Sequence, residues 1–221
     1  MWHRAIAFEH HEYQEGRLIV AIVITGAARG IGYAVAETLC ATGKPLVLVD
    51  IDQHALATAT SAIEARGTRV AAVVGSVASE AVAIEAAQAS RAPGGATGWS
   101  HNAGIQRYGT AIDTTPAAWD EVMDANLRGA FLFARVLLPQ LIESRGACVL
   151  MASVQGLATQ QNVAAYTVSK HALIGLARSI AVDFAADGVR ANAVAPGSAA
   201  RRSDGAEPVT EVRDRLGEDR G

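Results

Sequence analysis

The sequence has 221 residues, of which 50% are hydrophobic and 19% are charged. This length suits a single domain, and the composition excludes a disordered chain, which needs low hydrophobicity and high charge. The formal net charge of −3 leaves no basic excess to neutralise phosphates, so we expect no nucleic-acid partner.

The residue pattern predicts neither a membrane anchor nor a metal site. The longest run of apolar residues, 18–24, is far shorter than the roughly 20 residues that span a bilayer. The two cysteines, Cys40 and Cys148, are too few for a disulfide framework or a zinc cluster, and the histidines are scattered. Residues 1–16 lack the pattern of a secretion signal. We therefore expect a reduced, cytoplasmic protein without a membrane or metal partner.

Short apolar segments alternate with helix-length segments along the chain. Apolar runs rich in β-branched residues predict strands, and apolar residues at helical spacing predict helices. In chain order, the expected elements are a strand at 18–25, a helix at 30–42, a strand at 46–50, a helix at 54–66, a strand at 69–74, a helix at 79–90, a helix at 115–143, a strand at 147–152, a helix at 164–186 and a strand at 190–194. This alternation predicts an α/β fold, in which a doubly wound parallel sheet carries helices on both faces.

Two stretches interrupt this order. Between 92 and 101 the topology requires a buried central strand, but the residues are mostly glycine, small or polar, which are poor strand formers. The residues after Gly197 are rich in charge, so we expect them to form a mobile tail. The expected organisation is an N-terminal extension at 1–16, a folded domain at 17–197 and the tail at 198–221.

A glycine-rich turn follows the first predicted strand and opens the first predicted helix. Gly26, Gly30 and Gly32 lie at positions i, i+4 and i+6. Missing side chains let the backbone approach a pyrophosphate, whose charge the helix N-terminus favours. The three glycines alone would fit an ordinary turn equally well, but the strand before them and the helix after them favour a dinucleotide site.

Asp50 ends the second predicted strand and indicates which dinucleotide binds. A carboxylate there can accept hydrogen bonds from both hydroxyls of the adenosine ribose, and it would repel a 2′-phosphate. Arg29 in the turn could instead meet a 2′-phosphate. Because no basic residue directly follows Asp50, the sequence favours NAD over NADP. The alternative interpretation of Asp50 is a helix cap.

Tyr166 and Lys170 are four residues apart on the predicted helix at 164–186, so both project from one face. Such pairs are common on solvated faces, but this one follows a strand that ends near Ser153, and α/β sheets place their chemistry at the carboxyl ends of strands. An ammonium near a phenol favours the phenolate, so Tyr166 could exchange a proton with an alcohol or ketone during hydride transfer. Ser153 could hydrogen-bond the substrate oxygen.

These motifs resemble those of the short-chain dehydrogenases/reductases over residues 17–197. The matching segments are the turn at 25–32, the Asn-Ala-Gly element at 102–104, Asn126, Ser153, the Tyr166–Lys170 pair and the segment Asn-Ala-Val-Ala-Pro-Gly at 192–197. The resemblance implies a Rossmann-type fold and an oxidoreductase that transfers a hydride between NAD and a secondary alcohol or ketone. The implied catalytic residues are Asn126, Ser153, Tyr166 and Lys170. The implied cofactor-binding residues are Gly26, Arg29, Gly30, Ile31, Gly32, Asp50, Ile51, Ser76, Val77, Asn102, Ala103, Gly104, Tyr166, Lys170, Pro196 and Gly197.

The sequence departs from the family pattern in three places. Ser76 stands where an aspartate is usual, and His101 stands where an asparagine is frequent. The substrate lid and the usual seventh strand have no counterpart after residue 197. The resemblance therefore implies a sheet of six strands and a homodimer formed through the helices at 115–143 and 164–186, with a tetramer as the alternative.

Two other functions stay open at this point. A chain without a lid could bind NAD but fail to close on a substrate, which would make it a catalytically inactive nucleotide-binding protein. A lyase or epimerase could use the same fold and cofactor, although Ser153, Tyr166 and Lys170 together favour an oxidoreductase. We expect residues 154–163 to line the substrate entrance, and the substrate itself is not specified.

Overall fold

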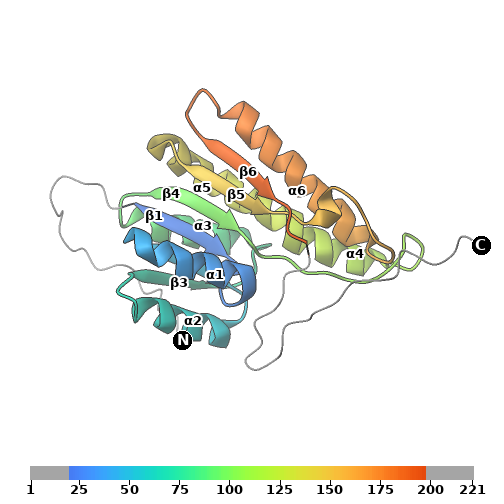
Figure 1. Ribbon diagram of the computed structural model, residues 1–221, viewed down its shortest axis with the longest axis horizontal. Helices are drawn as coiled ribbons and strands as arrows, with labels where there is room; N and C mark the ends of the chain where they lie inside the picture. Colours follow the sequence, from blue (N-terminus) through green and yellow to red (C-terminus); the bar gives the residue numbers. More distant parts are fainter. Residues whose placement is uncertain (1–19, 198–221) are drawn as a thin grey trace, which may run out of the picture.

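Six parallel strands form the central sheet of the structure, a computed structural model that describes residues 20–197 (Figure 1). The strands lie in the order β3-β2-β1-β4-β5-β6. Their bounds are β1 Ala21–Thr25, β2 Leu46–Asp50, β3 Val70–Val74, β4 Ala96–His101, β5 Ala147–Met151 and β6 Arg190–Val194. The predicted doubly wound α/β fold is confirmed. The predicted extension at 1–16 and tail at 198–221 lie outside the described residues.

Helices cover both faces of the sheet. Their bounds are α1 Gly30–Leu39, α2 Gln53–Glu64, α3 Glu80–Arg91, α4 Pro116–Met123, α5 Gly129–Ser144 and α6 Ala164–Asp183. Residues of α1 and α2 share one apolar cluster with Ile22 and Ile24 of β1, whereas residues of α3, α5 and α6 share another with Val23. Successive side chains of a strand point to opposite faces, so β1 contributes to both layers. A π-helical segment, Asp124–Arg128, separates α4 from α5 within the predicted helix at 115–143.

Local sequence explains where two of these helices begin. The carboxylate of Asp52 accepts a hydrogen bond from the backbone nitrogen of Ala55 at 3.0 Å and so caps α2. The hydroxyl of Thr115 accepts one from the backbone nitrogen of Ala118 at 3.2 Å and caps α4, whose first residue is Pro116. In the part of the chain that the structure describes, no helix is both long and apolar enough to cross a membrane.

Residues Ala96–His101 form a strand at the centre of the sheet, with a register shift against β1 between Ala21 and Ile22, which corrects the expectation of a poor strand at 92–101. β1 and β5 pair with β4 on its two sides. Trp99 lies almost wholly in the core, and a Cβ on Gly98 would lie only 3.3 Å from Cγ2 of Ile22. A glycine therefore fits where the neighbouring strand is close, and strand pairing with burial outweighs the low intrinsic strand preference of these residues.

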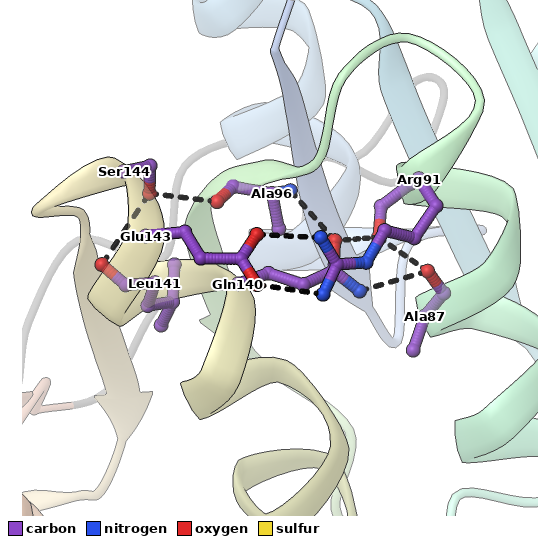
Figure 2. Close-up of polar contacts among 8 residues, drawn as sticks. Ala87, Arg91, Ala96, Gln140, Leu141, Glu143 and Ser144 are labelled. Atoms are coloured by element: carbon purple, nitrogen blue, oxygen red, sulfur yellow. Dashed lines mark hydrogen bonds and ion pairs between the residues drawn. The ribbon is translucent and has the colours of Figure 1, made fainter.

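A buried glutamine holds the start of β4 in place (Figure 2). Oε1 of Gln140, on α5, accepts hydrogen bonds from the backbone nitrogen of Ala96 at 2.8 Å and from the hydroxyl of Ser90 at 2.9 Å. Its Nε2 donates to the carbonyl oxygen of Ala87 at 2.9 Å. The side chain thus joins α5 to α3 and to the first residue of β4, and its polar atoms are paired although it is only 3% exposed.

Replacing this amide should cost far more stability than replacing a neighbouring charge. The substitution Gln140→Leu removes three hydrogen bonds and leaves buried groups unpaired, so we expect the free energy of unfolding to fall by about 2–4 kcal/mol in urea denaturation. The control is Glu143→Gln, which breaks an exposed ion pair with Arg91 and should cost less than about 1 kcal/mol. Equal losses in the two variants would contradict the role of Gln140.

Candidate cofactor and catalytic site

The glycine-rich turn between β1 and α1 leaves no room for side chains on its inner side. Gly26 has a φ of 62°, and a Cβ there would lie 2.8 Å from the backbone nitrogen of Ala103. A Cβ on Gly32 would lie 2.1 Å from the carbonyl oxygen of Gly26. The turn therefore packs both against the start of α1 and against the segment that follows β4.

The N-terminus of α1 fits a bound anion. This helix begins at Gly30, and its N-cap residue, Arg29, makes no side-chain capping hydrogen bond. A Cβ on Gly30 would meet nothing within 4 Å, so open space lies beside the start of the helix. The next residue, Ile31, is 37% exposed. Backbone N–H groups at a helix start favour a negative charge when no side chain caps them. These features match the pyrophosphate of a dinucleotide.

Asp50 is held beside the turn at the end of β2. Its Oδ2 accepts a hydrogen bond from the backbone nitrogen of Ala28, and its Oδ1 accepts one from that of Asp52, both at 3.0 Å. Arg29 forms an ion pair with Asp52. The carboxylate of Asp50 is therefore fixed in direction, and the positive charge of Arg29 is engaged by a neighbouring acid.

Three further residues of the predicted cofactor site follow β2 and β3. Ile51 is 72% exposed. The hydroxyl of Ser76 accepts a hydrogen bond from the backbone nitrogen of Ala78 at 3.2 Å. Val77 is buried, and its Cγ2 lies 2.7 Å from where a Cβ on Gly129 would stand. The side chain of Val77 thus packs against the first residue of α5.

The Asn-Ala-Gly element lies between the turn and the catalytic residues. The backbone nitrogen of Asn102 donates to the carbonyl oxygen of Thr25 at 3.3 Å. A Cβ on Gly104 would lie 3.0 Å from Oδ1 of Asn126 and 3.4 Å from Nζ of Lys170. The element therefore connects the two halves of the predicted site.

Asn126 sits in the π-helical segment Asp124–Arg128 and is wholly buried. Its Oδ1 accepts a hydrogen bond from the backbone nitrogen of Ile105 at 2.7 Å, and its Nδ2 donates to the carbonyl oxygen of Ile105 and to the hydroxyl of Ser169, both at 2.9 Å. This side chain joins the helix to the segment after β4 and to α6. Single π-helical turns are frequent at functional sites.

Lys170 and Tyr166 lie on one face of α6, next to the end of β5. Nζ of Lys170 donates to the carbonyl oxygen of Met151 at 2.7 Å and lies 5.5 Å from the ring centre of Tyr166. Burial lowers the pKa of Lys170 to about 8, because desolvation penalises the charged form. The hydroxyl of Ser153, two residues beyond Met151, accepts a hydrogen bond from the backbone nitrogen of Gln155 at 3.2 Å.

The segment after β6 reaches the loop that follows Ser153, and a shallow hollow lies beside the start of α6. The carbonyl oxygen of Pro196 accepts a hydrogen bond from the backbone nitrogen of Val154 at 2.8 Å, so the predicted segment at 192–197 reaches the loop that follows Ser153. The hollow has a volume of about 360 Å³ and ends at the first residue of α6. Its lining residues are Thr110, Thr159, Gln160, Gln161, Asn162, Val163 and Ala164.

Two contacts of the site carried no signal in the sequence. The carbonyl of Met151 is a backbone group, and the hydroxyl of Ser169 reaches Asn126 across elements far apart in the chain. His101, which stands where the family frequently has an asparagine, is fully buried. Burial, with a smaller effect of Lys170, lowers the pKa of His101 to about 3, so the ring stays neutral at physiological pH. Within residues 20–197, no group of acidic, histidine or cysteine side chains could hold a metal ion.

Comparison with known proteins finds a matching family and a related dehydrogenase. A family described as "short chain dehydrogenase" matches residues 20–211. The chain is 38% identical over 180 residues to 2-(S)-hydroxypropyl-CoM dehydrogenase 3 of Xanthobacter autotrophicus, a match that covers 80% of this chain and 70% of that protein.

Two solved structures extend this similarity to the fold. L-sorbose reductase of Gluconobacter frateurii, complexed with NADPH and L-sorbose, matches with a TM-score of 0.77 and 29% identity, over 80% of this chain and 69% of that one. A short chain dehydrogenase of Mycobacterium paratuberculosis bound to NAD matches with a TM-score of 0.77 and 30% identity, over 82% and 73% of the two chains.

Proposed function

Because the chain belongs to the short-chain dehydrogenase family, we propose that it transfers a hydride between NAD and a secondary alcohol or its ketone, with Tyr166 as the general acid or base. The observation that carries this proposal is the placement of a buried ammonium, Lys170, 5.5 Å from the ring of Tyr166 and 3.4 Å from where a Cβ on Gly104 would stand. The same segment at 102–104 contacts the glycine-rich turn, so the proton-transfer group adjoins the cofactor cradle.

The residues of the glycine-rich turn fit a nicotinamide cofactor, which the membership of this family supports. When bound, a nicotinamide cofactor supplies the carbon that accepts or releases the hydride. The start of α1, next to Gly30, would hold the pyrophosphate, and Asp50 would hold the adenosine ribose. Residues 102–104 and 196–197 would face the rest of the cofactor.

Lys170 acts on Tyr166 through its charge and its fixed position. Its hydrogen bond to the carbonyl oxygen of Met151 holds the ammonium close to the phenol. With a pKa of about 8, Lys170 is mostly protonated at neutral pH, so it places a positive charge 5.5 Å from the ring centre of Tyr166. In the oxidative direction the alcohol proton then passes to Tyr166 while the hydride leaves carbon, and in the reductive direction Tyr166 returns that proton. Ser153 would donate a hydrogen bond to the substrate oxygen.

Charge around the adenosine end supports NAD rather than NADP. Asp50 is fixed beside the turn, where its negative charge would repel a 2′-phosphate. Arg29, the basic residue of the turn, pairs with Asp52, which offsets part of its positive charge.

We also infer the assembly and the cellular location. α4, α5 and α6 expose large apolar side chains, which supports a homodimer formed through these helices. The exposed residues are Trp119, Phe131, Val168 and Val182. Both cysteines are free thiols, which supports a reducing compartment such as the cytoplasm.

The substitution Tyr166→Phe should abolish turnover and leave NAD binding nearly intact. Removing the phenolic oxygen removes the proton carrier, so we expect kcat to fall at least ~10²-fold while the Kd for NAD changes less than about threefold. A screen of secondary alcohols and ketones measures kcat, and calorimetry measures the Kd. The control is Tyr33→Phe, which removes the same phenolic oxygen from a tyrosine on α1, away from Ser153 and Lys170. Native chain that binds NAD but turns over nothing would favour an inactive nucleotide-binding protein, and a fully active Tyr166→Phe variant would remove Tyr166 from the mechanism.

Calorimetric titration should show tighter binding of NAD than of NADP. The substitution Asp50→Asn removes the repelling charge but keeps a hydrogen-bond acceptor, so we expect the Kd for NADP to fall about tenfold and the Kd for NAD to rise. The control is Asp120→Asn, an exposed acid on α4, which should leave both values unchanged. Tighter binding of NADP by the native chain would contradict the assignment.

Light scattering of the purified chain should give the mass of a dimer. Because Phe131 is 52% exposed, Phe131→Glu would place a charge in the interface and should shift the chain towards the monomer. The control is Ile51→Glu, at an exposed position outside the three helices. A stable tetramer, or a dimer that Phe131→Glu does not weaken, would contradict the proposed interface.

A further inference from the structure

A buried hydrogen bond joins the carboxyl ends of β1 and β4. Thr25 is the last residue of β1, His101 is the last residue of β4, and the two are paired across the strands. Oγ1 of Thr25 lies 3.0 Å from Nδ1 of His101, and neither residue has any exposed surface. The glycine-rich turn begins directly after Thr25, and the segment at 102–104 begins directly after His101.

The hydrogen bonds of the Thr25 hydroxyl determine which atom donates in this pair. Its oxygen also accepts from the backbone nitrogens of Asn102 at 3.2 Å and Ala103 at 3.4 Å. The N–H of Asn102 is shared with the carbonyl oxygen of Thr25 at 3.3 Å. A hydroxyl has two lone pairs and one proton, so lone pairs aimed at these two N–H groups leave the proton for a third partner. In that arrangement the proton points to Nδ1 of His101, 3.0 Å away. A ring nitrogen that accepts a hydrogen bond carries no proton, so the arrangement requires the neutral tautomer protonated on Nε2.

The surroundings of the imidazole keep the ring neutral, and the choice between the two neutral tautomers rests on the hydrogen bonds of Thr25. The ring packs edge-on against Trp99, with ring centres 5.7 Å apart, and lies 6.3 Å from the ring of Phe133. Nε2 finds no hydrogen-bond partner among residues 20–197. Burial and the nearby charge of Lys170 both disfavour protonation, so the ring remains neutral, as an accepting Nδ1 requires.

The direction of the Thr25 hydroxyl matters because two loops of the site meet there. Ala103, one of its donors, is the residue that a Cβ on Gly26 would overlap. The next residue, Gly104, approaches Asn126 and Lys170. A hydroxyl rotated away from Asn102 and Ala103 would weaken the hold on the segment that separates the cofactor cradle from the catalytic residues and leave the bond from Asn102 to the carbonyl oxygen of Thr25.

We propose that His101 is a positioning residue of the cofactor site: by accepting the proton of Thr25, it aims the lone pairs of that hydroxyl at the N–H groups of Asn102 and Ala103 and so holds residues 102–104 against the glycine-rich turn. The inference rests on the proposed nicotinamide cofactor. His101 itself touches neither substrate nor cofactor in this role.

The tautomer can be tested in the native chain, without any substitution. Nitrogen-15 NMR of the imidazole should find the proton of His101 on Nε2 and none on Nδ1 at neutral pH. A proton on Nδ1, or an imidazolium, would overturn the proposal, because the ring would then donate to Thr25 instead of accepting from it. This result does not depend on cofactor binding.

A pair of variants tests the positioning role. In His101→Asn the amide oxygen replaces Nδ1 as acceptor, so the Kd for NAD should stay within about threefold of the native value. In His101→Leu the acceptor is lost, and the Kd for NAD should rise about tenfold or more. If both variants bind NAD as the native chain does, with only the melting temperature changed, the role is purely structural and the proposal fails.

A double-mutant cycle connects the effect to Thr25. Thr25→Val removes the hydroxyl, so adding His101→Leu to it should cause no further rise in the Kd for NAD. Additive effects of the two substitutions would overturn the proposal, and Thr25→Ser is the control that keeps the hydroxyl. A native chain that binds neither NAD nor NADP would contradict the proposed function and with it the positioning role, whereas the tautomer would still be decided by NMR.

Discussion

The site depends on how closely two loops approach each other at the carboxyl ends of β1 and β4. A Cβ on Gly26 would stand 2.8 Å from the backbone of Ala103, so the loops touch through backbone atoms. This approach is available because β1 and β4 are neighbours in the middle of a parallel sheet. One loop leads to the uncapped start of α1 and the other leads to Asn126 and Lys170, so the contact sets the distance between the cofactor cradle and the catalytic residues.

Buried polar side chains connect the segments around this contact through hydrogen bonds and hold them in place. Burying a polar group is costly unless its hydrogen bonds are made, so each such side chain admits few arrangements of its neighbours. Asn126 joins three segments at the carboxyl end of the sheet, and Gln140 does the same at the other end of β4. Burial of the Lys170 ammonium costs free energy, because the charge loses its contact with water. Its hydrogen bond to the carbonyl oxygen of Met151 offsets this cost and holds the charge near Tyr166.

Much of the fold and of the site follows from local patterns. The strands expected at 46–50 and 190–194 have those bounds in the structure, because continuous apolar or alternating residues bounded by breakers allow little else. The strand at Ala96–His101 did not follow in the same way. Its glycine and polar residues favour a loop. Pairing with the two flanking strands and the hydrogen bond to the amide of Gln140 stabilise the extended conformation instead.

Residue types and their spacing specified the glycine turn, the acid that ends β2 and the Tyr166–Lys170 pair, because each lies within one element or one connection, where strand and helix geometry leave little freedom. The tertiary structure decided the partners of these groups. Lys170 binds a backbone carbonyl, and Thr25 meets His101 across 76 positions of sequence. Every residue carries backbone groups, and long-range pairing depends on the register of strands, so neither contact leaves a mark in the local pattern of residues.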